Sequence, residues 1–325
     1  MGQTQGISID AFGGADVMRF GPVEVAEPGE GDLLVAPEAA GVNFIDTYQR
    51  SGLYPITLPA VLGMEGAGTV LEIGPGVTDF AVGDLVAWLD VPGSYAARVV
   101  VPAARAVPVP DGVTAPVAAA SMLQGVTAQY LTTDSHPVRA GQTVLVHAAA
   151  GGVGLLLVQL AAAAGARVLG TVGTPEKAEL ARAAGAHEVI LYRDQDVVAS
   201  VEQLVGPHAV DVVYDGVGQA TFAASLDVLR PRGMLVSFGN ASGPVEPVAP
   251  LVLATKGSLF LTRPMLAHHV TETDELRRRA GAVLGMVESR RLDVRIGGTF
   301  PLDQARAAHQ ALEQRRTTGK VILTP

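Results

Sequence analysis

The stretch Val144-Leu145-Val146-His147-Ala148-Ala149-Ala150-Gly151-Gly152-Val153-Gly154 joins an apolar run to a glycine-rich turn. The apolar run predicts a short buried strand, and the apolar residues of 152–164 predict a buried helix. Between them the turn matches the pattern G-x-G-x-x-G, with Ala149 in the place of the first glycine. We expect Gly151 to let the backbone approach a pyrophosphate, and Gly154 to let the helix pack closely on the strand. The residues Gly151, Gly152, Val153 and Gly154 are therefore candidate ligands of a dinucleotide.

The segments after this turn alternate between strand and helix patterns. Strands are expected at 167–172, 189–192, 210–214 and 234–238, and helices at 175–184, 196–204 and 219–229. One boundary is marked by Thr174 as N-cap and Pro175 at the first helical position. Alternation at this spacing predicts an α/β fold with a doubly wound parallel sheet.

The first third of the chain differs, because it is rich in glycine, proline and short valine-rich runs. Strands are expected at 33–36, 68–73, 85–88 and 95–101, with turns at 74–76 and 92–93. This part is predicted to be a mostly β domain. After a strand at 258–261, a helix is expected at 273–289, a strand at 300–302, a helix at 303–314 and a closing strand at 320–323.

Composition excludes several classes of protein. Of the 325 residues, 48% are hydrophobic and 17% charged, and the net charge of −9 disfavours a nucleic-acid or anionic-membrane surface. The chain has no cysteine, which excludes disulfides and thiolate metal sites and fits a reducing compartment. The first ten residues do not have the pattern of a signal peptide. The apolar stretch 144–164 contains His147, Gln159 and several glycines, so a buried strand and helix explain it better than a membrane span. We expect a soluble, cytoplasmic protein without membrane insertion.

The choice of dinucleotide depends on the end of the second strand. An NAD site is expected to have an acidic residue there, to bind the ribose 2′-hydroxyl. This chain instead has Gly170-Thr171-Val172-Gly173-Thr174-Pro175-Glu176-Lys177, which offers room and a cation for a 2′-phosphate. The sequence therefore favours NADPH, with Lys177 as a phosphate ligand. The alternative for Lys177 is a solvated helix residue, and the nearby Glu176 and Glu179 temper the basic character.

Several further motifs resemble the quinone oxidoreductase (zeta-crystallin-like) family of the zinc-independent medium-chain dehydrogenase/reductase superfamily. The matching segments run nearly from end to end and lie at 41–48, 50–55, 63–68, 83–84, 147–154, 170–174 and 236–240. The resemblance implies a Rossmann nucleotide domain at residues 123–262. It is inserted into a GroES-like catalytic domain made of residues 1–122 and 263–325. It also implies a cleft at the domain junction and a homodimer.

The resemblance further implies a set of site residues. Asn43 and Tyr130 are expected to flank the nicotinamide, with Tyr48 as a further catalytic candidate. The residues expected around the 2′-phosphate are Gly173, Thr174, Lys177, Tyr192 and Arg315, and those expected along the nicotinamide side are Phe238, Gly239 and Arg263. From their positions alone, Asn43 could instead cap a turn, Tyr130 close a helix against the core, Tyr192 end a surface strand and Arg315 end a solvated helix.

A metal site is not expected. Zinc enzymes of this superfamily have Cys and His at the positions held here by Asn43 and Met64, and neither residue is a good zinc ligand. The seven histidines show no ligand-like spacing beyond the adjacent pair His268-His269, which we interpret as a polar loop. Without a Lewis acid, an unactivated ketone is difficult to reduce, whereas a quinone or enone is already electrophilic. Positioning of the acceptor over the nicotinamide would then carry most of the catalysis.

The favoured hypothesis is therefore an oxidoreductase that transfers hydride from NADPH to a quinone. One alternative is an NADPH-dependent reductase of α,β-unsaturated aldehydes, ketones or thioesters, with the same cofactor and a different acceptor. A second is an NADPH-binding protein with a structural or RNA-related role, which the acidic composition disfavours. The proton donor stays open between water, Tyr48 and Tyr54. Asp46 is expected to orient Asn43 or Tyr48, and Glu65 to hold the scaffold.

Overall fold

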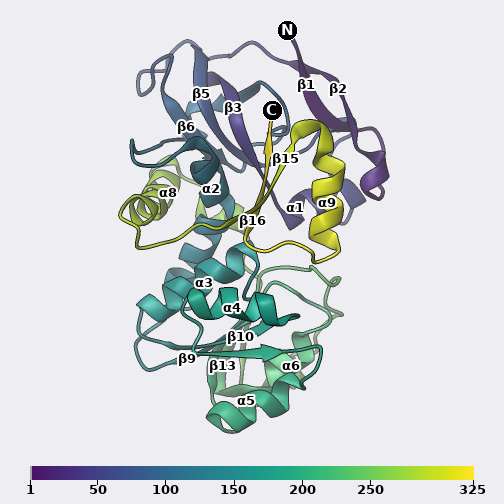
Figure 1. The fold of residues 1–325 in the computed structure, drawn as a ribbon, viewed down its shortest axis with the longest axis vertical. Helices are drawn as coiled ribbons and strands as arrows, with labels where there is room; N and C mark the ends of the chain where they lie inside the picture. Colours follow the sequence, from purple (N-terminus) through teal and green to yellow (C-terminus); the bar gives the residue numbers. More distant parts are fainter. Residues whose placement is uncertain (1) are drawn as a thin grey trace. The chain divides into compact units, whose positions relative to one another are not determined.

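A computed structural model describes residues 2–325, and these form two compact units. Unit 1 contains residues up to Val126 and again from His269 onward, and unit 2 contains Thr127–His268 (Figure 1). The mixed architecture, a parallel α/β sheet beside a mostly β unit, confirms the predicted fold class. The domain limits expected from the sequence differ from this division over residues 123–126 and 263–268, and they stay a prediction.

Unit 2 is built on a six-stranded parallel sheet in the order β11-β10-β9-β12-β13-β14. Its strands are β9 (Thr143–Val146), β10 (Arg167–Val172), β11 (Glu188–Leu191), β12 (Val210–Asp215), β13 (Leu229–Ser237) and β14 (Phe260–Thr262). Its helices are α3 (Gly152–Ala163), α4 (Pro175–Ala183), α5 (Val197–Val205), α6 (Phe222–Asp227) and α7 (Pro250–Thr255). The strand order reverses between β9 and β12, and ligands of such sheets bind at the carboxyl ends beside this reversal.

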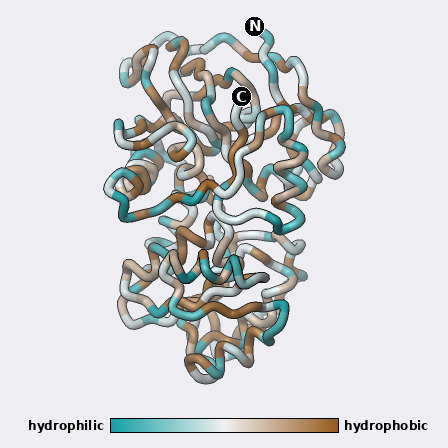
Figure 2. The backbone as a smooth tube through the Cα atoms, viewed as in Figure 1, coloured by the Kyte–Doolittle hydropathy of each residue, from teal (hydrophilic) through white to brown (hydrophobic). Residues whose placement is uncertain are grey.

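The strands of unit 2 are apolar because helices cover both faces of the sheet. Helices α3 and α4 lie together against β10, while Val201 of α5 and Leu226 of α6 join a buried cluster with Leu145 and Val213 (Figure 1). Hydrophobic stretches, drawn in brown, follow the sheet of this unit (Figure 2). None of the helices in residues 2–325 is long and apolar enough to cross a membrane.

Unit 1 contains a seven-stranded sheet in the order β15-β16-β3-β5-β6-β8, with β7 paired to β3, and a three-stranded sheet β2-β1-β4. Its strands are β1 (Gly2–Ile9), β2 (Arg19–Val25), β3 (Asp32–Val42), β4 (Ala60–Val61), β5 (Glu65–Ile73), β6 (Leu85–Leu89), β7 (Val99–Pro102), β8 (Ala106–Pro108), β15 (Ile296–Pro301) and β16 (Lys320–Thr324). Its helices are α1 (Phe44–Ser51), α8 (Thr273–Glu288) and α9 (Ala305–Glu313), and α2 (Ala115–Tyr130) begins in it. Strand β16 pairs with β3, so the late part of the chain completes the sheet begun by the early part.

Three local expectations from the sequence were wrong. The strand expected over 95–101 is shorter, because β7 begins at Val99 and the preceding residues turn against β1. The helix expected over 219–229 spans only Phe222–Asp227, since Leu229 already pairs with Val210 in the sheet. The closing β-α segment begins earlier than expected, because β15 already starts at Ile296.

Candidate active site and cofactor site

The glycine turn joins β9 to α3 as the sequence predicted. Gly151 is the N-cap of α3, and its neighbours Gly152, Val153 and Gly154 form the first helical turn. A Cβ atom on Gly154 would lie 2.3 Å from the carbonyl oxygen of Ala148, so a larger residue cannot be placed there without moving the backbone. This close approach of helix and strand leaves the α3 N-terminus open to an anionic group, which fits a dinucleotide pyrophosphate.

A second loop, at the carboxyl end of β10, contains the residues predicted to bind a 2′-phosphate. Thr174 caps α4 by accepting a hydrogen bond of 3.4 Å from the backbone N–H of Lys177. A Cβ atom on Gly173 would lie 2.8 Å from the phenol oxygen of Tyr192. The structure therefore brings Gly173, Thr174, Lys177 and Tyr192 to one edge of the unit 2 sheet.

Two further loops follow β12 and β13, and the second of them contains Phe238 and Gly239. Gly239 packs so closely on Gly216 that a Cβ atom on it would lie 2.3 Å from the Gly216 carbonyl oxygen. The loop after β12 is held by Asp215, whose carboxylate accepts backbone N–H bonds of 2.8 Å from Val217 and 3.0 Å from Gly218. Arg263 donates a hydrogen bond of 2.8 Å to the carbonyl oxygen of Ser237. These contacts fix three of the predicted nicotinamide-side residues beside the end of β13.

Beneath these loops a buried polar network joins neighbouring strands of the same sheet. His147 Nδ1 lies 2.9 Å from the Thr171 hydroxyl, and its Nε2 lies 3.1 Å from the Ser225 hydroxyl. The Ser225 hydroxyl also lies 3.0 Å from the Asp215 carboxylate. Burial lowers the pKa of His147. A neutral imidazole therefore bridges β10 and α6, and we assign this network to holding the loops in place.

Asn43, Tyr48 and Arg315 lie in unit 1. Asn43 is the N-cap of α1, and only 3% of its surface is exposed. Tyr48 is buried on the same helix and packs edge-on against Tyr54 at 5.3 Å between ring centroids. Arg315 lies just after α9 with a positive φ of 57°. Tyr130, the last residue of α2, belongs to unit 2 and is 2% exposed.

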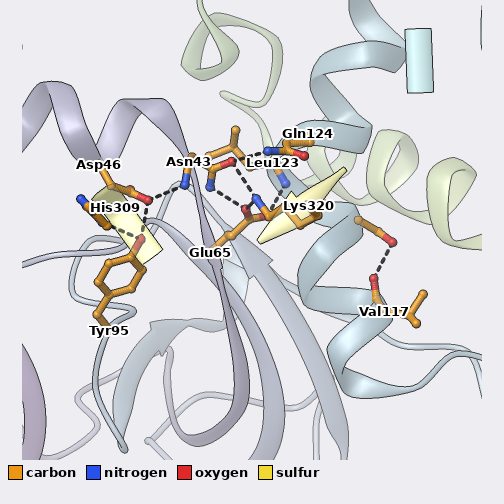
Figure 3. Close-up of polar contacts among 10 residues, drawn as sticks. Asn43, Asp46, Glu65, Tyr95, Val117, Leu123, Gln124, His309 and Lys320 are labelled. Carbon is orange, nitrogen blue, oxygen red and sulfur yellow. Dashed lines mark hydrogen bonds and ion pairs between the residues drawn. The ribbon is translucent and has the colours of Figure 1, made fainter. Parts of the chain in front are cut away.

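The amide of Asn43 is held by a buried ion pair that the sequence reasoning missed (Figure 3). Lys320 and Glu65 are 1% and 0% exposed and form a short contact through Nζ and Oε1. Lys320 Nζ donates to Asn43 Oδ1 at 2.7 Å, and Asn43 Nδ2 donates to Glu65 Oε1 at 2.6 Å. The second carboxylate oxygen of Glu65 accepts from the backbone N–H of Leu123 at 2.6 Å. The expectation that Glu65 holds the scaffold agrees with these contacts.

The charges of this cluster fix the orientation of the amide. Lys320 can only donate and the Glu65 carboxylate can only accept, so Oδ1 of Asn43 must face the former and Nδ2 the latter. Gln124 then has to present its Nε2, which donates to Asn43 Oδ1 at 3.1 Å, and its buried Oε1 has no partner among the described residues. Asn43 Oδ1 is doubly occupied, and Nδ2 uses one of its two N–H groups within residues 2–325. Toward a ligand, Asn43 can therefore act only as a hydrogen-bond donor.

Comparison with known proteins shows similarity over nearly the whole chain. Residues 29–111 match the family model of the alcohol dehydrogenase GroES-like domain, and residues 152–274 match the zinc-binding dehydrogenase model. A quinone oxidoreductase of Pseudomonas aeruginosa is 46% identical over 98% of this chain and 99% of its own length. The solved structure of Escherichia coli quinone oxidoreductase complexed with NADPH is 41% identical, with a TM-score of 0.96 over 99% of this chain and 100% of that one.

The chain belongs to the quinone oxidoreductase family. A 2-haloacrylate reductase of Burkholderia is also similar, at 42% identity over 96% of each chain. Although one matching model is named for zinc, the two superfamily ligand positions hold Asn43 and Met64. In residues 2–325 no three His, Cys, Asp or Glu side chains gather into a possible metal site.

Behind Asn43 lies a second buried cluster around Asp46, which is fully buried on α1 (Figure 3). Asp46 Oδ2 accepts from the backbone N–H of Asn43 at 2.8 Å and from the Tyr95 hydroxyl at 2.7 Å, whereas Oδ1 has no partner among the described residues. Burial raises the pKa of Asp46 to about 7, against the lowering effect of the Tyr95 hydrogen bond. Asp46 thus orients the backbone of Asn43, and it is a neutral acid at mildly acidic pH.

This cluster does not form a proton path from the surface. Arg50 Nη1 donates to His309 Nδ1 at 3.1 Å, so Nδ1 must be the unprotonated nitrogen and Nε2–H faces Tyr95 at 3.3 Å. Burial, assisted by the Arg50 charge, lowers the pKa of His309 to about 3. With Nδ1 occupied by the guanidinium, His309 in this arrangement has no free nitrogen to accept a proton.

We predict that replacing Asp46 with Asn flattens part of the pH dependence of stability. The pKa of Asp46 is about 7 in the fold, whereas the ordinary value of an aspartate is 3.8. The contribution of neutral Asp46 to the free energy of unfolding is therefore complete below pH 3.8. It is lost as the pH rises through 7, by up to about 1.4 kcal/mol per pH unit. When the free energy of unfolding is measured in urea from pH 5 to 8, the stability of Asp46→Asn relative to the wild type should increase with pH.

The matched control is Asp79→Asn. Asp79 is exposed, and its hydrogen bond from Arg277 lowers the pKa, so its stabilisation is present above the ordinary pKa and is lost only in acid. The difference in free energy of unfolding between Asp79→Asn and the wild type should stay constant from pH 5 to 8. An Asp46→Asn difference that is equally constant would contradict a neutral buried acid.

Proposed function

We propose that this chain catalyses hydride transfer from NADPH to a quinone. The observation that carries the proposal is the full-length similarity to quinone oxidoreductases, one of which has a solved structure complexed with NADPH. The loops of unit 2 support it, because they offer a glycine turn at Gly154 for the pyrophosphate and place Lys177 in the first turn of α4. When bound, NADPH supplies a hydride, and a proton from water or a side chain completes the hydroquinone.

The site residues are proposed with the roles that the resemblance implies. The glycine turn of 151–154 would bind the pyrophosphate. Gly173, Thr174, Lys177, Tyr192 and Arg315 would surround the 2′-phosphate. Asn43 and Tyr130 would flank the nicotinamide, with Phe238, Gly239 and Arg263 along its side and Tyr48 near the acceptor.

The residues around Asn43 explain how this chain would position a ligand without a metal. The Lys320 ammonium withdraws electron density from the Asn43 amide through Oδ1, which strengthens the remaining N–H as a donor. Asn43 would then hold a ligand oxygen in one place, since neither its rotation nor its polarity is free. Orientation of this kind contributes more to transfer between two already reactive carbons than charge neutralisation does.

Proton supply to the reduced acceptor is proposed to come from water or Tyr48. Asp46 accepts a hydrogen bond directly from the backbone N–H of Asn43, but it is fully buried, and Nδ1 of His309 in the same cluster is occupied by Arg50. The ring of Tyr48 on α1 packs in a T-shaped arrangement against the ring of Tyr54, which follows the helix.

A reductase of conjugated carbonyl compounds is the second candidate. Its support is the 42% identity to a 2-haloacrylate reductase, a protein named for a conjugated acid. Both candidates use the same cofactor and differ in the acceptor. Side-by-side turnover of a quinone and an enone separates them.

The proposal predicts that the purified protein oxidises NADPH when a benzoquinone or naphthoquinone is added, and does so far more slowly with NADH. Absorbance of the reduced nicotinamide follows the reaction, and prolonged chelator treatment should leave the rate unchanged because Asn43 and Met64 are poor metal ligands.

Lys177→Ala should weaken NADPH binding about tenfold and leave NADH binding nearly unchanged. Equal affinity for the two cofactors, or activity that returns only with stoichiometric zinc, would contradict the proposal.

We also predict that Asn43→Ala and Tyr130→Ala lower turnover about tenfold or more, which corresponds to about 1.4 kcal/mol of barrier each. Melting temperatures separate this role from a scaffold role. Variants that melt early but retain turnover per folded molecule would assign these residues to the scaffold.

A homodimer in the cytoplasm is proposed as the working state. The absence of cysteine supports a reducing compartment. Among the described strands β14 pairs with β13 alone, so it is an edge. Phe260 on it is 55% exposed, with Leu251 at 71% and Met265 at 53% nearby in sequence. Exposed apolar side chains on an open edge support pairing with a second copy across a two-fold axis.

Phe260→Glu is therefore expected to shift the protein toward monomer in size-exclusion chromatography with light scattering. The control is Phe20→Glu, which places the same charge at a residue that is 48% exposed on β2. If both variants and the wild type have the mass of a monomer, the homodimer is wrong.

A further inference from the structure

The turn after β11 places a second cation at the edge of the sheet that contains Lys177. A Cβ atom on Gly173 would meet not only the Tyr192 hydroxyl but also Arg193 Nε, at 3.2 Å. The two neighbouring side chains therefore lie together over the Gly173 backbone. The sequence reasoning named Tyr192 and overlooked Arg193.

This turn is held on both sides before any ligand arrives. The backbone N–H of Tyr192 donates to the Val172 carbonyl oxygen at 3.1 Å, which ties the turn to the end of β10. Gln195 closes the turn with two hydrogen bonds to Leu191. Its side-chain Oε1 accepts from the Leu191 N–H at 2.8 Å, and its backbone N–H donates to the Leu191 carbonyl oxygen at 3.0 Å. A closed turn lowers the entropy lost when its side chains bind an anion.

The guanidinium of Arg193 is exposed and has no hydrogen bond or ion pair within residues 2–325. Some other arginines of unit 2 are paired, namely Arg182 with Glu179 at 2.6 Å and Arg230 with Asp211 at 2.7 Å. An unpaired guanidinium held over a glycine is available to a phosphate without first breaking an ion pair. Its planar fork of N–H donors matches phosphate oxygens.

An acidic side chain beside Lys177 gives a further cation at this edge a role. Glu176 stands beside Lys177 in the first turn of α4, and its hydrogen bond with Thr174 lowers the pKa of the carboxyl group. Glu176 is therefore ionised at neutral pH and opposes the charge of Lys177. With these two alone, the loop after β10 offers a 2′-phosphate almost no net positive charge, and Arg193 restores it.

We propose that Arg193 is a specificity-determining residue that binds the 2′-phosphate of NADPH opposite Lys177. This inference rests on the proposed function. It assigns the preference for NADPH to side chains of unit 2, with Tyr192 between the two cations as a hydroxyl donor. NADH has a hydroxyl group in place of the phosphate, so Arg193 has no anion to bind in that cofactor.

The test is the dissociation constant of 2′,5′-ADP, NADPH and NADH, measured by calorimetry or by quenching of nicotinamide fluorescence. We compare wild type with Arg193→Gln, which keeps a polar side chain and removes the guanidinium and its charge. Arg232→Gln is the matched control, because Arg232 is another exposed arginine of unit 2 and lies on β13, remote in sequence from both loops.

Arg193→Gln should raise the dissociation constants of 2′,5′-ADP and NADPH about tenfold and change that of NADH less than twofold. Arg193→Lys should recover part of the lost affinity. Arg232→Gln should change none of the three constants by more than twofold. The inference is overturned if Arg193→Gln binds 2′,5′-ADP like wild type, or if both variants lose affinity equally. A wild type that binds NADPH no better than NADH would instead contradict the proposed function itself.

Discussion

The buried pair of Lys320 and Glu65 is the contact on which the rest of unit 1 depends. Each charge is almost completely removed from water, a cost that is recovered only if every oxygen and N–H group finds a partner. The partners come from four elements: β16, β5, the N-terminus of α1 at Asn43, and α2 at Leu123. A single ion pair thereby fixes where these elements meet. Loss of either charge would leave the other buried and unpaired.

The same pair decides what Asn43 can do. An exposed asparagine can offer a ligand either an oxygen or an N–H group, whereas Asn43 has its oxygen occupied twice. The superfamily position that holds a metal ligand in zinc enzymes is occupied in this chain by a donor of fixed polarity. Two of the relatives are named for a quinone and for a conjugated acid, acceptors that are electrophilic already.

The sequence predicted unit 2 well because its signals are local. The strand Arg167–Val172 and the N-cap at Thr174 agree with the structure residue for residue, since the apolar run and the Thr-Pro cap lie within a few positions of each other. The helix after Gly218 was predicted too long, because the pairing of Leu229 with Val210 depends on a neighbouring strand and not on helix propensity.

The candidate site was predicted less completely. Lys320 has only one sequence signal, a rare lysine at the head of the apolar run Val321-Ile322-Leu323, and its partner Glu65 lies 255 positions away. Arg193 stands in a polar turn where a solvated arginine is ordinary, so only its position over Gly173 distinguishes it. Long-range pairing and loop geometry are the parts that local patterns do not contain.

The pairing of β16 with β3 has a consequence for how the chain folds during synthesis. Unit 2 is one continuous segment and has every strand of its sheet once residue 268 has left the ribosome. Unit 1 must wait, because β3 and β5 emerge long before β16 and Glu65 has no counter-ion until Lys320 appears. During that interval the early part of the sheet lacks the strand that pairs with β3 and the counter-ion of Glu65. Completion of unit 1 is thereby delayed until the inserted unit has had time to fold.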